Sequence, residues 1–195
     1  MALPKTVAEF LASTRTAYTT KKHPVAYTAQ EIAAATHVPG SQLAKSVLIK
    51  TSDGFALAVL PATQRVDFKK LQALLKVKKV SIASEGDIKT LFPGMEVGAM
   101  PPFGNLYNVP MVVDTSLNDA ETIVCNAGSH TETMSLRTAD WLRLVKPKAG
   151  QFGVPPEGQM KKQAKTPKKK SSKKPAKQRK KPAKKPSKKP AKKKR

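Results

Sequence analysis

The sequence is poor in several features that common protein classes require. It has one cysteine in 195 residues, Cys125, which excludes an internal disulfide framework. Its longest apolar run, FALAVL at 55–60, is far too short to span a bilayer. The opening MALPKTVAEF has neither a basic start nor a continuous apolar stretch, so it does not resemble a secretory signal. We therefore expect a cytoplasmic protein with no membrane partner.

Sequence motifs of the common enzyme classes are also missing. There is no GxSxG elbow, no phosphate loop and no strand followed by GxGxxG. The three histidines, His23, His37 and His130, are far apart and have no Cys or His at metal-ligand spacing. Cys125 lies in an apolar stretch, which favours a small buried hydrophobe over a nucleophile. We expect neither a metal site nor a cofactor.

Acidic residues are absent from the C-terminal part of the chain. Residues 160–195 hold 20 of the 37 Lys and Arg and none of the 13 Asp and Glu, while the whole chain carries +24. Residues 1–159 keep 17 basic and 13 acidic side chains, a balance of +4. We therefore predict one globular domain over 1–159 and a separate polycationic tail over 160–195.

The tail is predicted to be disordered, because it has no aromatic residue and Pro182, Pro186 and Pro190 interrupt any helix. Its charge favours nucleic-acid binding through phosphates, without base stacking. The alternatives are a solvated run that only keeps the protein soluble and, with less support, a membrane surface. The predicted nucleic-acid-binding residues are Lys168, Lys169, Lys170, Lys173, Lys174, Lys180, Lys181, Lys184, Lys185, Lys188 and Lys189.

The body alternates between helix-like and strand-like segments. Helices are predicted over 5–18, 28–38 (ending at Pro39 and Gly40), 68–76, 85–92 and 138–145, with N-caps at Thr28, Asp67, Ser84 and Thr138. Strands are predicted on both sides of SDG at 52–54, as a hairpin with Gly54 in the left-handed position, and over 78–84, 109–114, 121–127 and 131–136. Because several strands are joined by short turns, we expect an α/β fold with a mixed, mostly antiparallel sheet surrounded by helices.

Three local features of the body are unusual. Lys45 interrupts the apolar run LAKSVLI, where alternation places it on one face with Val47 and Ile49. The stretch VGAMPPFGN at 97–105 has two prolines, two glycines and no charge. In NAGSHTE at 126–132 a glycine and a histidine separate two strands. Taken alone, these features favour a lysine reaching solvent from an edge strand, a turn and a solvated loop histidine.

Taken together, the three features resemble the YbaK and prolyl-tRNA synthetase-associated domain family, the trans-editing aminoacyl-tRNA deacylases. GSQLAKSVLI, GAMPPFG and AGSH follow that family's order and spacing, and the resemblance extends from about His23 to Trp141. It implies a hydrolase that removes a wrong amino acid from the terminal adenosine of a tRNA. The implied partner is aminoacyl-tRNA, and an aminoacyl-tRNA synthetase is a candidate second partner. The tail has no counterpart in that family and looks like a linker-histone appendage.

The resemblance also implies the site residues. Lys45 matches the family lysine, Gly98 to Pro102 match its GXXXP loop, and Gly128 with His130 match its second glycine loop. The predicted catalytic set is Lys45, Gly98, Ala99, Met100 and His130; the predicted substrate-binding set is Val47, Pro101, Pro102, Gly128 and Ser129. In that family, the substrate's own ribose hydroxyl and backbone groups are thought to assist water attack.

Residue chemistry is compatible with this implied site. Backbone amides of Gly98, Ala99 or Met100 can stabilise the oxyanion of ester hydrolysis without a charged side chain. Lys45 can hold a carbonyl or phosphate as a point charge, while His130 could order a water, contact the adenosine or act as a general base. Met100 and the residues around Val47 and Ile49 are expected to narrow the pocket toward a small amino acid, alanine first, with serine and cysteine as alternatives. The alternatives are a nucleoid-like or chromatin-like binder, and a non-catalytic tRNA or synthetase adaptor.

Overall fold

The computed structural model describes residues 3–156, so the predicted tail and its lysines lie outside the described residues. The helices are α1 (Lys5–Ser13), α2 (Ala29–Thr36), α3 (Phe68–Leu75), α4 (Glu85–Leu91) and α5 (Thr138–Val145), with short 3₁₀ turns η1 (Gly104–Tyr107) and η2 (Thr115–Asp119). The strands are β1 (Tyr18–Lys22), β2 (Ala44–Thr51), β3 (Gly54–Pro61), β4 (Arg65–Val66), β5 (Val80–Ile82), β6 (Met111–Asp114), β7 (Thr122–Ser129), β8 (Glu132–Arg137), β9 (Lys148–Gly150) and β10 (Gly153–Val154).

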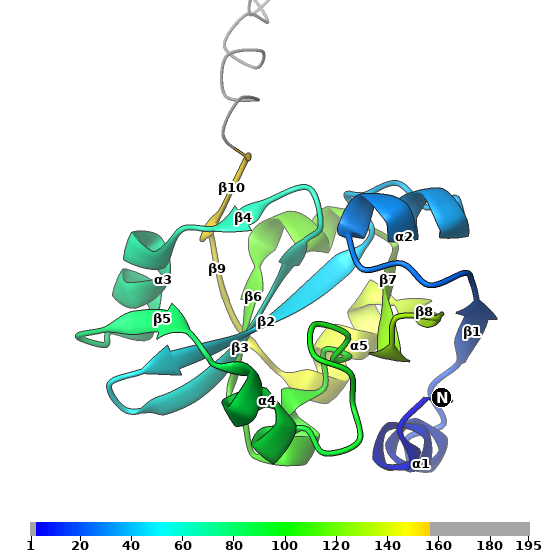
Figure 1. Cartoon of the computed structure of the whole chain (residues 1–195), viewed down its shortest axis with the longest axis horizontal. Coiled ribbons are helices and arrows are strands. Elements are labelled where there is room, and N and C mark those ends of the chain that lie inside the picture. The colour runs from blue at the N-terminus through cyan, green and yellow to red at the C-terminus, as the bar shows by residue number, and fades with distance from the viewer. Residues whose placement is uncertain (1–2, 157–195) are drawn as a thin grey trace, which may run out of the picture.

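Two main sheets organise the molecule. The larger has the order β5-β2-β3-β6-β9, in which β5, β2 and β3 are antiparallel and β6 and β9 are added in parallel. The smaller, β1-β8-β7, is antiparallel, and β10 pairs with β4 in a third, two-stranded ladder. In Figure 1, α3 lies beside β5 at one side of the molecule, and α2 lies above β7 at the other. The predicted mixed, mostly antiparallel α/β fold is confirmed.

Local sequence signals account for most of the element boundaries. The predicted hairpin is present, with Gly54 at a φ of +131° in the turn that follows Asp53. Thr28 and Glu31 form a reciprocal capping box at α2, and Ser84 and Asp87 form another at α4. The carboxylate of Asp67 caps α3 by accepting from the amides of residues 69 and 70.

The predicted first helix was too long. Helix α1 ends at Ser13, Arg15 takes a left-handed φ of +51°, and Tyr18 begins β1 instead of closing a helical face. The hydroxyls of Ser13 and Thr14 bond back to the Phe10 carbonyl, and threonines dominate the residues that follow. Such residues compete with the helix for backbone bonds and favour a strand.

Two further boundary predictions were wrong. Helix α2 ends at Thr36 because His37 takes a left-handed conformation, so the chain leaves the helix before Pro39. Thr138 is the first residue of α5, whereas Arg137 occupies the cap without a side-chain bond. The Thr138 hydroxyl instead donates to the Ala120 carbonyl at 2.5 Å, which ties the helix to the preceding loop.

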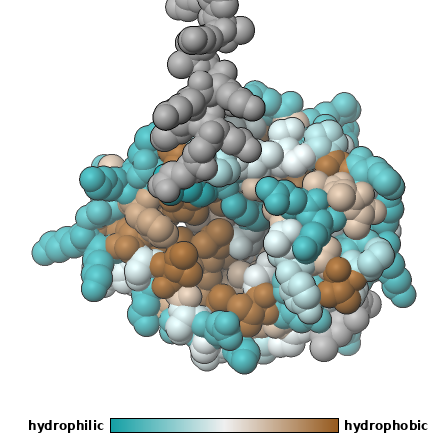
Figure 2. Space-filling view, turned by 45° about the horizontal axis from the view of Figure 1, so that its top comes forward, coloured by the Kyte–Doolittle hydropathy of each residue, from teal (hydrophilic) through white to brown (hydrophobic). Residues whose placement is uncertain are grey.

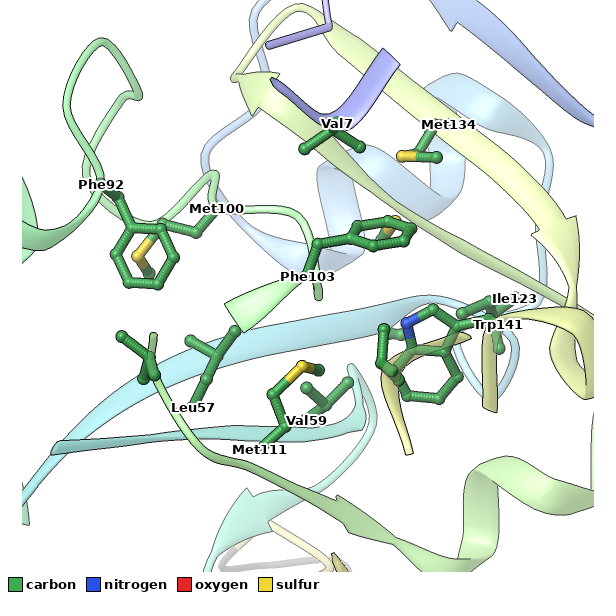
Figure 3. Close-up of a cluster of buried hydrophobic side chains, with 14 of the residues drawn as sticks. Val7, Leu57, Val59, Phe92, Met100, Phe103, Met111, Ile123, Met134 and Trp141 are labelled. Carbon is green, nitrogen blue, oxygen red and sulfur yellow. The ribbon is translucent and has the colours of Figure 1, made fainter. Parts of the chain in front are cut away.

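The main core fixes the C-terminal half of the glycine- and proline-rich loop at 97–105. Figure 3 shows Met100 and Phe103 among buried side chains between the sheets, with Trp141 of α5 nearby. The Trp141 indole donates to the Pro102 carbonyl at 2.8 Å, and Phe103 packs edge-to-face on Phe10. Core packing holds this part of the loop, because α5 contacts it through Trp141 and α1 contacts it through Phe10.

The surface carries few large hydrophobic side chains. Figure 2 shows one face with a mostly hydrophilic rim and a group of hydrophobic side chains toward its middle. Among residues 3–156, the most exposed large hydrophobic side chains are Tyr27 and Ile82, which are 72% and 64% exposed. Over residues 3–156, no helix has the length and apolarity needed to cross a membrane.

Asp114 anchors the last described segment of the chain. It is buried, and its carboxylate accepts from the amide and hydroxyl of Ser116 and from the amides of Phe152 (2.7 Å) and Gly153 (2.6 Å). Burial alone would raise its pKa, but the hydrogen bonds from Ser116, Gly153 and Phe152 outweigh it, so the pKa lies below the ordinary aspartate value. The ionised carboxylate is therefore part of the fold.

Asp114→Ala is expected to lower the free energy of unfolding by about 2 to 4 kcal/mol at neutral pH, because buried amides lose their acceptor. Asp119→Ala, at an exposed aspartate on η2, is the control and should change it by less than about 0.5 kcal/mol. A carboxyl group whose pKa is lower in the folded than in the unfolded state stabilises the fold at pH values above the unfolded-state pKa. This stabilisation is lost as pH falls through the folded-state pKa. Urea unfolding should thus show the Asp114 effect shrinking at acidic pH; an effect that stays constant with pH contradicts this account.

Candidate active site

A small pocket lies where the two main sheets meet. Leu43, just before β2, forms a single parallel bridge with Val124 of β7, and the Val124 amide donates to the Gln42 carbonyl at 2.9 Å. Within residues 3–156, no further bridge joins β2 to β7, and a cavity of about 150 Å³ lies beside this junction. Its lining residues are Tyr27, Ala29, Ile32, Leu43, Ala44, Lys45, Ser46, Gly98 and Asn126.

The two glycine loops singled out in the sequence are bonded to each other. The Glu96 amide donates to the Gly128 carbonyl, and the Gly128 amide donates to the Ala99 carbonyl, both at 3.0 Å. The Ala99 amide closes a tight turn by donating to the Glu96 carbonyl. Gly98 and Gly128 have φ values of +87° and +97°, which favour glycine at both positions. The structure thus places residues 96–99 directly against residues 128–130.

His130 is fixed behind this loop. Its backbone amide donates to the Glu96 carboxylate at 2.6 Å, and its ring Nε2 lies 3.0 Å from the Val97 carbonyl. Since a carbonyl only accepts, Nε2 carries the proton, and Nδ1 is left buried without a partner among the described residues. The ring also packs on Tyr27, with centroids 4.8 Å apart. His130 lines a neighbouring cavity of about 380 Å³ and positions the wall formed by Tyr27 and Gly98.

Lys45 brings a cation to the pocket. Its side chain is half-buried, and burial lowers the pKa of its ammonium. The structure gives it no ion pair or hydrogen bond with any residue of 3–156. A partly desolvated cation without a counterion attracts electron-rich oxygen more strongly than an exposed lysine does. The alternative of an edge-strand lysine extended into solvent does not describe this position.

Several residues predicted for the site do not line the pocket. Met100, Pro101 and Pro102 are buried, with Met100 in the main core (Figure 3), and Val47 packs against the second core cluster around Ile49. The expectation that Met100 and Val47 narrow the pocket therefore finds no support in the geometry. None of these four residues is part of the pocket lining.

The remaining predicted residues lie at or behind the pocket wall. Ser129 is buried, and its hydroxyl contacts that of Thr131 at 3.2 Å. Of the three amides predicted to bind the oxyanion, that of Ala99 is already bonded within the turn. The amides of Gly98 and Met100 make no hydrogen bond to other described residues, and of these two only Gly98 lines the pocket, so its amide is the available donor.

Three lining residues were not found from the sequence: Tyr27, Ser46 and Asn126. A signal existed for Asn126, a polar residue within the apolar strand sequence ETIVCNA. Ser46 adjoins Lys45 but looks ordinary in a strand, and Tyr27 precedes a helix cap without any motif. Their placement depends on how the two sheets meet, which local sequence patterns do not reveal.

Within residues 3–156, Cys125 and the acidic and histidine side chains form no second cluster of reactive groups. Burial raises the pKa of the Cys125 thiol, which keeps it protonated. In the described part of the chain, no three His, Cys, Asp or Glu side chains are grouped as metal ligands would be. The chemistry of the pocket therefore falls to a lysine, main-chain amides and neutral polar groups.

The pocket lysine and the two glycine loops lie within a segment that matches a known protein family. The model of the aminoacyl-tRNA editing domain matches residues 23–144. The chain belongs to this family. The matched range includes the pocket, both glycine loops and nearly all of α5, as the sequence resemblance predicted.

Curated relatives share part of this domain. The multifunctional Ser/Thr-tRNA deacylase ProXp-y of Escherichia coli (strain K12) is 33% identical over 97 residues, which make up 49% of this chain and 58% of that protein. The proline--tRNA ligase of Thermosipho africanus (strain TCF52B) is 31% identical over 77 residues, 40% of this chain and 14% of the ligase. The chain thus spans somewhat more than half of the first relative and a small part of the second.

Solved structures support the fold. A protein provisionally assigned as a trans-editing enzyme for prolyl tRNA synthetase matches with a TM-score of 0.68 at 20% identity, covering 77% of this chain and 96% of that one. The hypothetical protein APE2540 matches with a TM-score of 0.70 at 19% identity, covering 77% and 100%. At these identities the likeness concerns the fold of the editing domain.

Proposed function

We propose that this editing domain hydrolyses the ester bond of mischarged aminoacyl-tRNA that carries a small amino acid. The observation that carries the proposal is the pairing of Lys45 with Gly98 in the lining of one small pocket. Lys45 supplies an unpaired cation, and the Gly98 amide is an uncommitted donor. The relative named a Ser/Thr-tRNA deacylase supports the same reaction class.

The proposed reaction needs few protein groups. Water adds to the ester carbonyl, the tetrahedral oxyanion collapses, and the bond to the ribose oxygen breaks, giving a free amino acid and a tRNA hydroxyl. A fixed main-chain donor stabilises such an oxyanion by roughly 3 to 4 kcal/mol. The Gly98 amide takes this role, while Lys45 holds the carbonyl oxygen or an adjacent phosphate. His130 acts as a positioning residue, because its Nε2 proton is already bonded to the Val97 carbonyl.

Pocket size supports a small amino acid. Sites for drug-sized ligands usually measure about 300 to 1,000 Å³, and this cavity measures about 150 Å³. Apolar side chains of α2, of Leu43 and of the start of β2, including Ile32 and Ala44, exclude larger side chains by contact. Alanine, serine and cysteine remain the candidates.

The deciding experiment is a deacylation assay with a panel of mischarged tRNAs. The protein should release small amino acids well above the uncatalysed rate and leave bulky ones attached. A nucleoid-like protein would bind DNA tightly and spare every ester, and an adaptor would bind tRNA and spare every ester. If no ester of the panel is cleaved above background, the deacylase proposal is wrong. Pull-down with prolyl-tRNA synthetase tests the synthetase partner suggested by the similar ligase segment.

The basic segment 160–195 is proposed to raise the local tRNA concentration without contributing to the chemistry. A chain ending at Gln159 should keep its rate at saturating tRNA but bind tRNA more weakly at low salt, with a shallower dependence of log affinity on log salt. Filter binding from 50 to 300 mM salt measures the slope. An unchanged slope would assign tRNA binding to the body instead.

A further inference from the structure

Glu96 joins the two glycine loops through three separate groups. Its carboxylate accepts from the His130 amide at 2.6 Å, its amide donates to the Gly128 carbonyl, and its carbonyl accepts from the Ala99 amide. The first two bonds connect the loops, and the third closes the turn that contains Gly98. Glu96 is half-buried and does not line the 150 Å³ pocket. It can therefore influence the pocket only through the groups that it holds.

The turn that begins at Glu96 has the geometry of a type II turn. The Ala99 amide closes it at 3.0 Å, and Gly98, its third residue, has a φ of +87°, while the φ of Val97 is negative. A rotation of the central peptide by roughly half a turn converts a type II turn into a type I turn, which reverses the direction of that peptide's N–H. The central peptide here joins Val97 to Gly98, so neighbouring contacts must fix the direction of the Gly98 N–H.

His130 fixes the direction of this central peptide. A trans peptide directs its C=O and its N–H to opposite sides. Because the Val97 carbonyl lies 3.0 Å from the imidazole Nε2, the Gly98 N–H of the same peptide points away from the imidazole. Gly98 lines the 150 Å³ pocket, and His130 lines the neighbouring cavity instead. The imidazole bond thus favours the orientation that leaves the Gly98 N–H free for an oxyanion.

Glu96 in turn fixes His130. The bond from the His130 amide to the carboxylate is short, and an ionised acceptor makes such a bond stronger than one between neutral groups. Without the carboxylate, the His130 amide loses its acceptor, and the main chain between β7 and β8 is held less firmly. The imidazole follows its own main chain, so its bond to the Val97 carbonyl weakens as well.

We infer that Glu96 is a positioning residue: through His130 it keeps the Gly98 N–H directed at the developing oxyanion. This inference rests on the proposed deacylase function. A fixed donor stabilises the oxyanion because it needs no reorientation at the moment of reaction. An interaction made only in the transition state contributes to kcat and leaves KM unchanged. Loss of the Glu96 carboxylate should therefore appear in kcat.

The kinetic test compares Glu96→Ala and Glu96→Gln with Glu121→Ala, a control at an exposed glutamate before β7. On alanyl-tRNA, Glu96→Ala should lower kcat by about 20-fold or more and change KM by less than about threefold. Glu96→Gln keeps an oxygen that can accept from the His130 amide, so it should retain about a third of the wild-type kcat or more. The control should keep both constants. An unchanged kcat in Glu96→Ala, or a loss confined to KM, overturns the inference.

A tetrahedral mimic gives a readout that needs no hydrolysis. Adenosine with a 3′ ester of 1-aminoethylphosphonate presents an oxyanion, whereas adenosine that carries alanine through a stable 3′-amide presents a planar carbonyl. Calorimetric titration should show Glu96→Ala binding the phosphonate about tenfold more weakly than wild type does, with affinities for the amide within about threefold. Equal phosphonate affinity in wild type and variant contradicts the positioning role.

A double-mutant cycle tests whether Glu96 acts through the Gly98 amide. Glu96→Ala and Gly98→Ala should each weaken phosphonate binding, and the double variant should bind within about twofold of the weaker single variant, because both changes remove one shared contact. Losses that multiply overturn this inference while leaving the deacylase proposal standing. A wild type that cleaves no ester, but whose phosphonate affinity depends on Glu96 as expected, refutes the deacylase proposal alone.

Discussion

Replacing Lys45 with methionine is expected to lower kcat/KM for a small mischarged aminoacyl-tRNA by about 100- to 1,000-fold, the usual effect of removing a group that stabilises an oxyanion. Methionine keeps the length and apolar stem of the side chain, so the half-buried pocket wall stays filled. The fold should therefore be retained, with an unchanged urea midpoint. Deacylation rates and unfolding curves, measured on one preparation, separate chemistry from stability.

Two further variants sharpen the Lys45 test. Lys79→Met removes one positive charge from an exposed position before β5 and should leave the rate within about twofold, since a distant surface charge is screened. Lys45→Arg keeps the charge but replaces a compact ammonium with a planar fork and should recover only part of the activity. Equal losses in Lys45→Met and Lys79→Met would show that net charge, rather than the pocket cation, controls the rate.

The burial of Lys45 also predicts a pH dependence. The ammonium is charged below its pKa in the folded protein and loses its charge as pH rises through that value. Because burial lowers this pKa, the loss occurs at lower pH than for an exposed lysine. Affinity for adenosine that carries alanine through a stable 3′-amide should fall along this alkaline limb in the wild type, and the limb should be missing in Lys45→Met. A limb that persists in the variant belongs to another group.

The sequence predicted the fold well where local chemistry determines structure. Capping residues such as Thr28 and Ser84 mark helix starts because their side chains bond amides three residues away, a contact any chain can make by itself. The predictions failed where the same segment can form either a helix or a strand. Tyr18 fits a helical face by spacing alone, but the pairing of β1 with β8, whose partner residues are 110 to 118 positions apart along the chain, decides its structure. The short β9 and β10 likewise exist only through distant partners.

The site was predictable in part for the same reason. Lys45, Gly98 and His130 were found because their segments resemble a known family, and the structure brings those segments together. Ser46 was missed because it is ordinary within its own strand, and Asn126 because one polar residue in an apolar strand does not by itself indicate a site. They become unusual only when the bridge between Leu43 and Val124 encloses them, and that junction depends on both sheets. Long-range packing thus adds the polar groups that the motifs leave out.

Gly98→Ala is expected to abolish most of the activity while the domain remains folded. Gly98 lines the pocket at a φ of +87°, and a Cβ built there meets only the His130 ring, at an ordinary contact distance of 3.7 Å. The cost to the fold is thus the left-handed backbone conformation, about 1 to 2 kcal/mol. The added methyl group reduces close approach of the ester to the Gly98 amide, so a loss in kcat/KM of about 100-fold or more is expected.

Gly94→Ala is the matched control for this prediction. Gly94 lies four residues earlier at a φ of +78°, and a Cβ there meets nothing within 4 Å, so the same backbone strain arises away from the pocket. Both variants should lose similar free energy of unfolding, but only Gly98→Ala should lose activity. Because both variants carry the same backbone strain, the difference in their kcat/KM measures the effect of the added methyl group beside the ester. Equal activity in the two variants would mean that the Gly98 amide does not face the reacting carbonyl.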